Sequence, residues 1–171
     1  KFDAKAGDFK TELVKIKSQN PADIFLIATP KHAGLILKQA AELGIKAQFY
    51  NIGVEGPELV QLAGMAAEGL LYPYSYDSLD TTVSVAQFYT KYITRFKRSP
   101  DTVAVNVYDA AYLLTNCIEK AGVETWKVKE CLYGVKDFKG AGGRFSIDAN
   151  GDAVKDIFFK TVKGGQFVRY T

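Results

Sequence analysis

Residues that bind metals or act as catalytic bases are scarce in this chain of 171 residues. It has one histidine, His32, and two cysteines, Cys117 and Cys131. A single histidine excludes every metal motif that needs a histidine pair, and two cysteines exclude a four-cysteine zinc site. No G-x-G-x-x-G turn follows an expected strand, which excludes that dinucleotide fingerprint. The sequence therefore predicts neither a metal nor a cofactor.

Long apolar runs and clustered charges are also missing. No apolar run approaches the ~18 residues of a membrane span. The 22 basic and 19 acidic residues are interspersed and give a net charge of +3, which does not favour nucleic acid as a partner. A hydrophobic content of 47% excludes disorder and is enough for a buried core. The length alone predicts one domain.

Catalysis would have to depend on His32. A nucleophilic triad needs a nucleophile, a base and an orienting group, and His32 is the only histidine that could be the base. No G-x-S-x-G accompanies it. It stands near the expected start of a helix, where a cation is disfavoured. We therefore expect His32 to be a polar residue on the surface or in a cleft, and the protein not to be an enzyme. The alternative is an α/β enzyme that uses His32 as its base.

The two cysteines stand 14 positions apart, on helices that we expect to be neighbours. Two buried thiols and one disulfide are both compatible with this spacing. Export to an oxidising compartment would favour the disulfide. The sequence alone leaves both alternatives open.

The first part of the chain alternates between helical and strand patterns. A continuous apolar run over residues 23–28 is typical of a parallel strand covered on both faces. Helices and strands then alternate at short spacing, which predicts a parallel α/β layer. The expected elements are helices at 9–19, 30–43 and from 57, and strands at 23–28, 46–51 and 69–72.

The pattern changes near residue 75. A turn-rich stretch precedes three expected helices, and the end of the chain is strand-like around the turn Asn150-Gly151. We interpret residues 140–143 as a flexible crossing or a bulge. Asp148, Asn150 and Asp152 fit a hairpin better than a calcium loop, because no glutamate closes the loop. The expected helices are 81–98, 103–121 and 125–135, and the expected strands are 144–148, 157–162 and 167–170.

Two loops follow the first two expected strands, at residues 29–32 and 51–55. In open α/β sheets, ligands bind beyond the carboxyl ends of the strands. Each loop leads into the N-terminus of a helix, where free N–H groups favour an anion or an acceptor. The two loops are therefore the candidate binding segments, and ordinary capped loops are the alternative.

The same stretches resemble the periplasmic substrate-binding proteins of the leucine/isoleucine/valine-binding type, the receptors of branched-chain amino-acid ABC transporters. The similarity runs nearly end to end in the family's order. The matching segments are Gly7-Asp8-Phe9, Leu13-Val14-Lys15-Ile16-Lys17, Asn20-Pro21-Ala22-Asp23, Lys38-Gln39-Ala40, Leu43-Gly44-Ile45, Pro57-Glu58-Leu59, Leu62-Ala63-Gly64, Ala67-Glu68-Gly69, Tyr108-Asp109-Ala110, Gly143-Arg144-Phe145 and Asn150-Gly151-Asp152.

The resemblance implies the type I periplasmic-binding fold, in which two α/β lobes close as a clamshell on a small ligand. It also implies a truncated chain, the C-terminal half of such a protein, whose second lobe begins upstream of Lys1. Residues 1–78 would form an α/β segment of the second lobe, residues 79–138 a helical segment of the first lobe, and residues 139–171 the strands that return to the second lobe.

The resemblance also places ligand contacts on both loops. They would fall at Thr29, Pro30, His32, Ile52, Gly53, Val54 and Glu55. Amino-acid binders of this family often use an acidic residue in the second loop to hold the ligand ammonium. Ile52 stands at that position here, with Glu55 three positions later. Because a buried ammonium without a carboxylate partner is costly, either Glu55 turns inward or the ligand is an aliphatic or aromatic carboxylate rather than an amino acid.

The expected function is that of an extracytoplasmic solute-binding component of an ABC transporter. Its partners would be a small amino acid or carboxylate, an ABC permease, and either a second copy or the missing N-terminal half to cover exposed apolar surface. Its location would be periplasmic or extracellular, with a lipid anchor as a possibility in the full-length protein. The alternative is the ligand-sensing ectodomain of a signalling receptor with the same fold.

Overall fold

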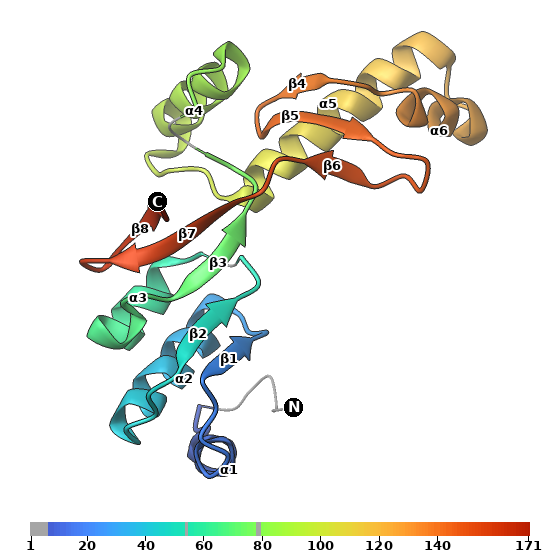
Figure 1. The fold of residues 1–171 in the computed structure, drawn as a ribbon. Coiled ribbons are helices and arrows are strands. Elements are labelled where there is room, and N and C mark those ends of the chain that lie inside the picture. The colour runs from blue at the N-terminus through green and yellow to red at the C-terminus, as the bar shows by residue number, and fades with distance from the viewer. Residues whose placement is uncertain (1–6, 54, 78–79) are drawn as a thin grey trace. The chain divides into compact units, whose positions relative to one another are not determined.

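The computed structural model describes residues 7–53, 55–77 and 80–171, and it divides into two compact units (Figure 1). Unit 1 comprises Lys1–Tyr74 and Phe158–Thr171, and unit 2 comprises Ser75–Ile157. The chain thus returns to unit 1 at Phe158. No helix within the described ranges combines the length and the apolar character needed to cross a membrane.

Unit 1 contains a five-stranded sheet in the order β1-β2-β3-β7-β8. Strands β1, β2 and β3 are parallel, and β7 and β8 are antiparallel additions beside β3. This confirms the parallel α/β layer that the sequence predicted. The elements are α1 (Lys10–Lys17), β1 (Asp23–Leu26), α2 (Pro30–Glu42), β2 (Gln48–Asn51), α3 (Pro57–Ala63), a 3₁₀ turn (Gly64–Ala67), β3 (Leu71–Tyr74), β7 (Phe158–Lys163) and β8 (Gln166–Arg169).

Helix α2 is the central helix of unit 1. Its glycine, Gly34, allows close packing on α3, because a Cβ there would lie 2.7 Å from the carbonyl oxygen of Leu59. Gln39, which is 9% exposed, ties α2 to the start of α1. Its side-chain oxygen accepts from the amide of Phe9 at 2.7 Å, and its nitrogen donates to the carbonyl of Gly7 at 3.0 Å. These contacts satisfy polar groups that burial would otherwise penalise.

The two faces of β1 differ in exposure. Ile24 and Leu26 are buried, whereas Phe25 is 60% exposed and Ile27 is 72% exposed. The sequence predicted burial on both faces of this strand, and within the described residues only the face that carries Ile24 and Leu26 is covered. Strand β1 is also the first strand in the sheet order, so one of its edges is unpaired in this part of the chain.

Unit 2 combines three helices with a separate three-stranded antiparallel sheet in the order β4-β5-β6. The three helices agree with the predicted ones to within two residues at either end. The sequence did not predict the short strands β4 and β6, which pair on either side of β5. The elements are α4 (Val83–Phe96), α5 (Thr102–Ala121), α6 (Thr125–Tyr133), β4 (Phe138–Gly140), β5 (Gly143–Ile147) and β6 (Ala153–Lys155).

The glycine-rich segment at residues 140–143 is an anchored hairpin turn rather than a flexible crossing. The buried carboxylate of Asp109 on α5 accepts from the amides of Ala141 at 2.6 Å and Gly142 at 2.8 Å. A Cβ at Gly140 would lie 2.7 Å from Oδ1 of Asp109, and one at Gly142 would lie 2.9 Å from Nζ of Lys155. The small residues therefore allow the turn to approach the carboxylate.

Cys117 on α5 and Cys131 on α6 form a disulfide, with their Cα atoms 5.7 Å apart. This decides between the two alternatives that the sequence left open. The turn at Asn150 is a hairpin, as predicted. The carboxylate of Asp148 accepts from the amides of Asn150 at 2.8 Å and Asp152 at 2.9 Å, and it therefore serves the turn rather than a calcium ion. Among the residues described, no cluster of histidine, cysteine, aspartate and glutamate could hold a metal ion.

Candidate functional site

The carboxyl ends of the parallel strands lie at one edge of the unit 1 sheet. In the register of β1 and β2, Leu26 is opposite Asn51. Because Tyr74 at the end of β3 pairs with Phe158 at the start of β7, the chain also leaves and re-enters unit 1 at this edge (Figure 1). Both candidate loops begin here, which is the position that favours ligand binding in α/β sheets.

The first loop is organised by Thr29. Its hydroxyl accepts from the amide of His32 at 3.5 Å and lies 2.7 Å from Nδ1 of the same residue, so it caps helix α2. Pro30 occupies the first helical position. The ring of His32 stands edge-on to the ring of Phe9, with 6.0 Å between their centroids. These contacts fix the imidazole beside the start of the helix.

The second loop passes close to the end of β3. Gly53 has a φ of +86°, and a Cβ there would collide with the carbonyl oxygen of Pro73. Only glycine therefore suits this position without displacement of the loop. Ile52 is 45% exposed, and its amide donates to the side chain of the buried Asn51 at 2.5 Å. Val54 lies outside the described residues.

The two loops touch each other. A Cβ at Gly56 would lie 2.8 Å from Cβ of Pro30, so the end of the second loop packs on the start of α2. The structure thus brings Thr29, Pro30 and His32 to the same edge as Ile52 and Gly53.

Glu55 has partners within unit 1. Its carboxylate accepts from the phenolic hydroxyl of Tyr72 at 2.6 Å and forms an ion pair with the ammonium of Lys160. The side chains of Glu55 and Lys160 are 18% and 16% exposed. Burial, and then the hydrogen bond to Glu55, raise the pKa of Tyr72 far above its ordinary value. The hydroxyl is therefore a hydrogen-bond donor at every physiological pH.

Sequence reasoning did not find Tyr72 and Lys160. Tyr72 lies in an expected strand, and Lys160 lies in a segment expected to return to the same lobe, but neither segment indicates which residues meet. The antiparallel register of β3 and β7 places Lys160 directly opposite Tyr72. The ammonium also lies 4.6 Å from the ring centroid of Tyr74, where the ring adds a cation–π contact.

An apolar groove of about 660 Å³ lies beside the first loop. It runs along β1 and has α1 as one wall. Thr29 and His32 stand at its end. The groove is lined by Phe9, Glu12, Leu13, Ile16, Ile24, Phe25, Leu26, Ile27, Ala28, Thr29, His32 and Ile36.

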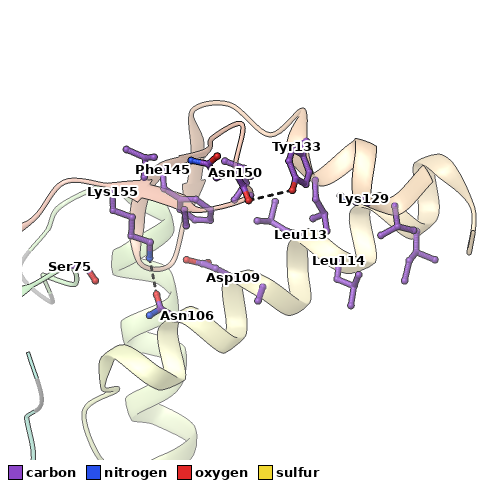
Figure 2. A pocket seen from close by; sticks show the side chains of 18 of the residues that line it. Ser75, Asn106, Asp109, Leu113, Leu114, Lys129, Tyr133, Phe145, Asn150 and Lys155 are labelled. Carbon is purple, nitrogen blue, oxygen red and sulfur yellow. Dashed lines mark hydrogen bonds between the residues drawn. The ribbon is translucent and has the colours of Figure 1, made fainter. Parts of the chain in front are cut away.

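A larger open cavity, of about 1180 Å³, lies in unit 2 between α5, α6 and the β5–β6 hairpin (Figure 2). Two of its polar side chains have hydrogen-bond partners: Lys155 donates to Asn106 at 2.8 Å, and Tyr133 donates to the carbonyl of Asn150 at 3.4 Å. Burial lowers the pKa of Lys155, and the charge of Asp109 opposes that shift. None of the predicted contacts lines this cavity, so its size alone does not make it the candidate site.

Comparison with known proteins decides the family. A family model described as periplasmic binding protein matches residues 1–166. The chain belongs to that family. This confirms the resemblance stated from the sequence, and the α/β fold agrees with the type I periplasmic-binding fold.

Several members of the family are similar in sequence and structure. The chain is 27% identical over 150 residues to Leu/Ile/Val-binding protein homolog 2 of Brucella abortus, a match that covers 85% of this chain and 39% of that protein. A leucine-binding protein, LivK, of Thermotoga maritima has a TM-score of 0.90 at 30% identity, covering 99% of this chain and 49% of that one. LivJ of Streptococcus pneumoniae, solved with isoleucine, has a TM-score of 0.82 at 27% identity over 97% of this chain and 48% of that one.

These similar proteins are substrate-binding proteins of transporters rather than enzymes. The chain spans about two fifths to one half of their length. The fold and the binding-protein class are therefore established for this chain.

Proposed function

We propose that this chain belongs to an extracytoplasmic solute-binding component of an ABC transporter, which binds a small amino acid or carboxylate and delivers it to a membrane permease. The observation that carries the proposal is the family match over residues 1–166. The named functions of the similar proteins, which bind leucine, isoleucine and valine, support it.

The disulfide supports a location outside the cytoplasm. Disulfides persist in oxidising compartments, whereas cytosolic thiols are kept reduced. The bond between Cys117 and Cys131 is therefore consistent with an exported protein. In this proposal, unit 1 belongs to the second lobe of the clamshell, and the helices of unit 2 belong to the first lobe.

The proposed ligand contacts are those of the two touching loops. Thr29, Pro30 and His32 form the first group, and Ile52 and Gly53, with Val54, form the second. The geometry that supports this assignment is their common position at the carboxyl edge of the parallel strands, where ligands bind in open α/β sheets.

Calorimetry on the product of the complete gene tests the proposal. We expect saturable 1:1 binding of one compound from a panel of amino acids and organic acids, with no chemical turnover. Ile52→Ala removes apolar contact from the second loop and should weaken binding about tenfold or more, since each buried methylene contributes about 0.8 kcal/mol. Val14→Ala is the control, because Val14 is an exposed apolar residue of unit 1 (53% exposed) outside both loops.

Two results would count against this function. The absence of heat for every compound in the panel would contradict solute binding. A gene that continues into a membrane-spanning segment and a cytoplasmic module, with no permease gene beside it, would instead favour the ligand-sensing ectodomain.

A further inference from the structure

The charge state of the second loop bears on the class of ligand. Glu55 is the only acidic residue among the predicted contacts, so it is the group to which a ligand ammonium would be expected to bind. Its carboxylate already accepts from Tyr72 at 2.6 Å and pairs with Lys160. The pair has no net charge.

Separation of this pair would be costly. Both side chains are more than four fifths buried, and loss of one partner from a buried ion pair leaves an uncompensated charge. Tyr72 is 1% exposed, so its hydroxyl would also lose its acceptor. A ligand ammonium that recruited Glu55 would have to displace Lys160 and compensate for both losses.

The three groups lie on the buried face of the sheet. Tyr72 and Tyr74 are 1% and 5% exposed, and Lys160 is opposite Tyr72 in the strand register. Glu55 therefore turns from its loop toward β3 and β7. In this position the carboxylate holds the second loop to the sheet.

The other predicted contacts on the two loops carry no carboxylate. The predicted contacts that remain include a hydroxyl at Thr29, an imidazole at His32 and an aliphatic side chain at Ile52, which is 45% exposed; Pro30, Gly53 and Val54 add no charged group. The other acid near the loop is Glu58, which lies in the first turn of α3 and is exposed. These predicted contacts thus include no carboxylate without a cation.

We propose that Glu55 is the counter-ion of Lys160 and not a ligand group, and that the solute is a carboxylate without an ammonium group, either aliphatic or aromatic. This inference rests on the proposed function and narrows it to one ligand class. Glu55 is then a positioning residue, because it acts on the ligand only through the conformation of the second loop.

The test compares ligands that differ only in the amine. Leucine and 4-methylpentanoate share one carbon skeleton, and benzoate represents aromatic carboxylates. With the product of the complete gene in a calorimeter, we expect 4-methylpentanoate or benzoate to bind at least about tenfold more tightly than leucine. The Glu55→Gln/Lys160→Met double variant removes both charges of the pair, and it should weaken leucine and 4-methylpentanoate by the same factor, which leaves their affinity ratio unchanged within about twofold.

Other results would overturn the inference. If leucine binds about tenfold more tightly than 4-methylpentanoate, and Glu55→Gln lowers the affinity for leucine alone by about 100-fold, then Glu55 holds the ammonium. If Glu58→Gln has that effect, the ligand class is wrong although the pairing of Glu55 is right. Binding of none of the compounds in the wider panel would refute the proposed function itself.

Two further variants separate positioning from mere stability. Lys160→Met leaves the carboxylate of Glu55 without its cation, and we expect it to shift the affinity ratio toward leucine by about fivefold or more. The Glu55→Gln/Lys160→Met double variant should lack this shift. The pairing is also tested without ligand: each single variant should lower the melting temperature, and the double variant should lower it by less than the sum. Additive losses would overturn the pairing.

Discussion

The carboxylate of Asp109 is expected to be the main polar anchor of the β4–β5 hairpin to α5. Asp109 is 3% exposed and accepts from two backbone amides, at 2.6 Å and 2.8 Å. Replacement by alanine would leave both amides without this acceptor in a buried place. It would also remove the negative charge that opposes the lowering of the Lys155 pKa.

The size of the effect follows from these two bonds. A hydrogen bond to a charged group contributes about 1.5–3 kcal/mol, so Asp109→Ala should lower the free energy of unfolding of unit 2 by about 3–5 kcal/mol. Asp109→Asn keeps one acceptor oxygen and should cost about half as much. Since whole domains are stable by only about 5–15 kcal/mol, the alanine variant is expected to be close to its unfolding threshold.

Urea denaturation followed by the fluorescence of Trp126 measures this loss. The chain has one tryptophan, and it lies in α6, so the signal reports on unit 2. With an urea slope of about 1–3 kcal/mol per molar, the midpoint should fall by at least about 1 M. Asp156→Asn removes an exposed aspartate of the same unit and is the control. A loss below about 1 kcal/mol for Asp109→Ala, similar to that of the control, would refute the anchoring role.

Three further predictions concern the disulfide, the second loop and the buried tyrosine. Replacement of Cys117 and Cys131 by serine should lower the free energy of unfolding by about 3 kcal/mol, as expected for a closed loop of about 15 residues; reductant should then destabilise the original chain but not the variant. Gly53→Ala should destabilise unit 1 by more than Gly44→Ala, because both glycines have a positive φ but only Gly53 lacks space for a Cβ; equal losses in urea denaturation would show that the collision is relieved easily. Because the pKa of Tyr72 is raised in the folded state, its contribution to the free energy of unfolding is complete below about pH 10 and declines by up to about 1.4 kcal/mol per pH unit above that value. Tyr72→Phe should remove this decline between pH 10 and 11. If the variant shows the same slope of unfolding free energy against pH as the original chain, the burial of the hydroxyl is contradicted.

Local patterns in the sequence were sufficient for most of unit 1. The apolar run at residues 23–28 and the start of a helix at residue 30 each depend on a few neighbouring residues. The parallel order of the first strands followed from their short alternation with helices. The same reasoning placed both candidate loops at one edge of the sheet, and the structure brings them into contact there.

The later strands needed information that no local pattern contains. Strands β4 and β6 are three residues long, too short for a periodic signal. The turn at residues 140–143 resembles a flexible linker until Asp109, more than 30 positions earlier, is brought against it. The division into two units likewise depends on contacts between distant residues, because the β5–β6 hairpin stays in unit 2 and only β7 joins β3.

The role of Glu55 shows the same limit where it affects function. A glutamate after a strand, beside a glycine and ahead of a helix, has the position of a ligand-binding residue. Its actual partner, Lys160, is 105 positions away and reaches it only because β7 pairs antiparallel with β3. If the proposed contacts hold the solute, the preference of the site for or against an amine depends on this strand pairing. For that reason a ligand class read from the loop alone could point to an amino acid, whereas the paired carboxylate points to an acid without an amine.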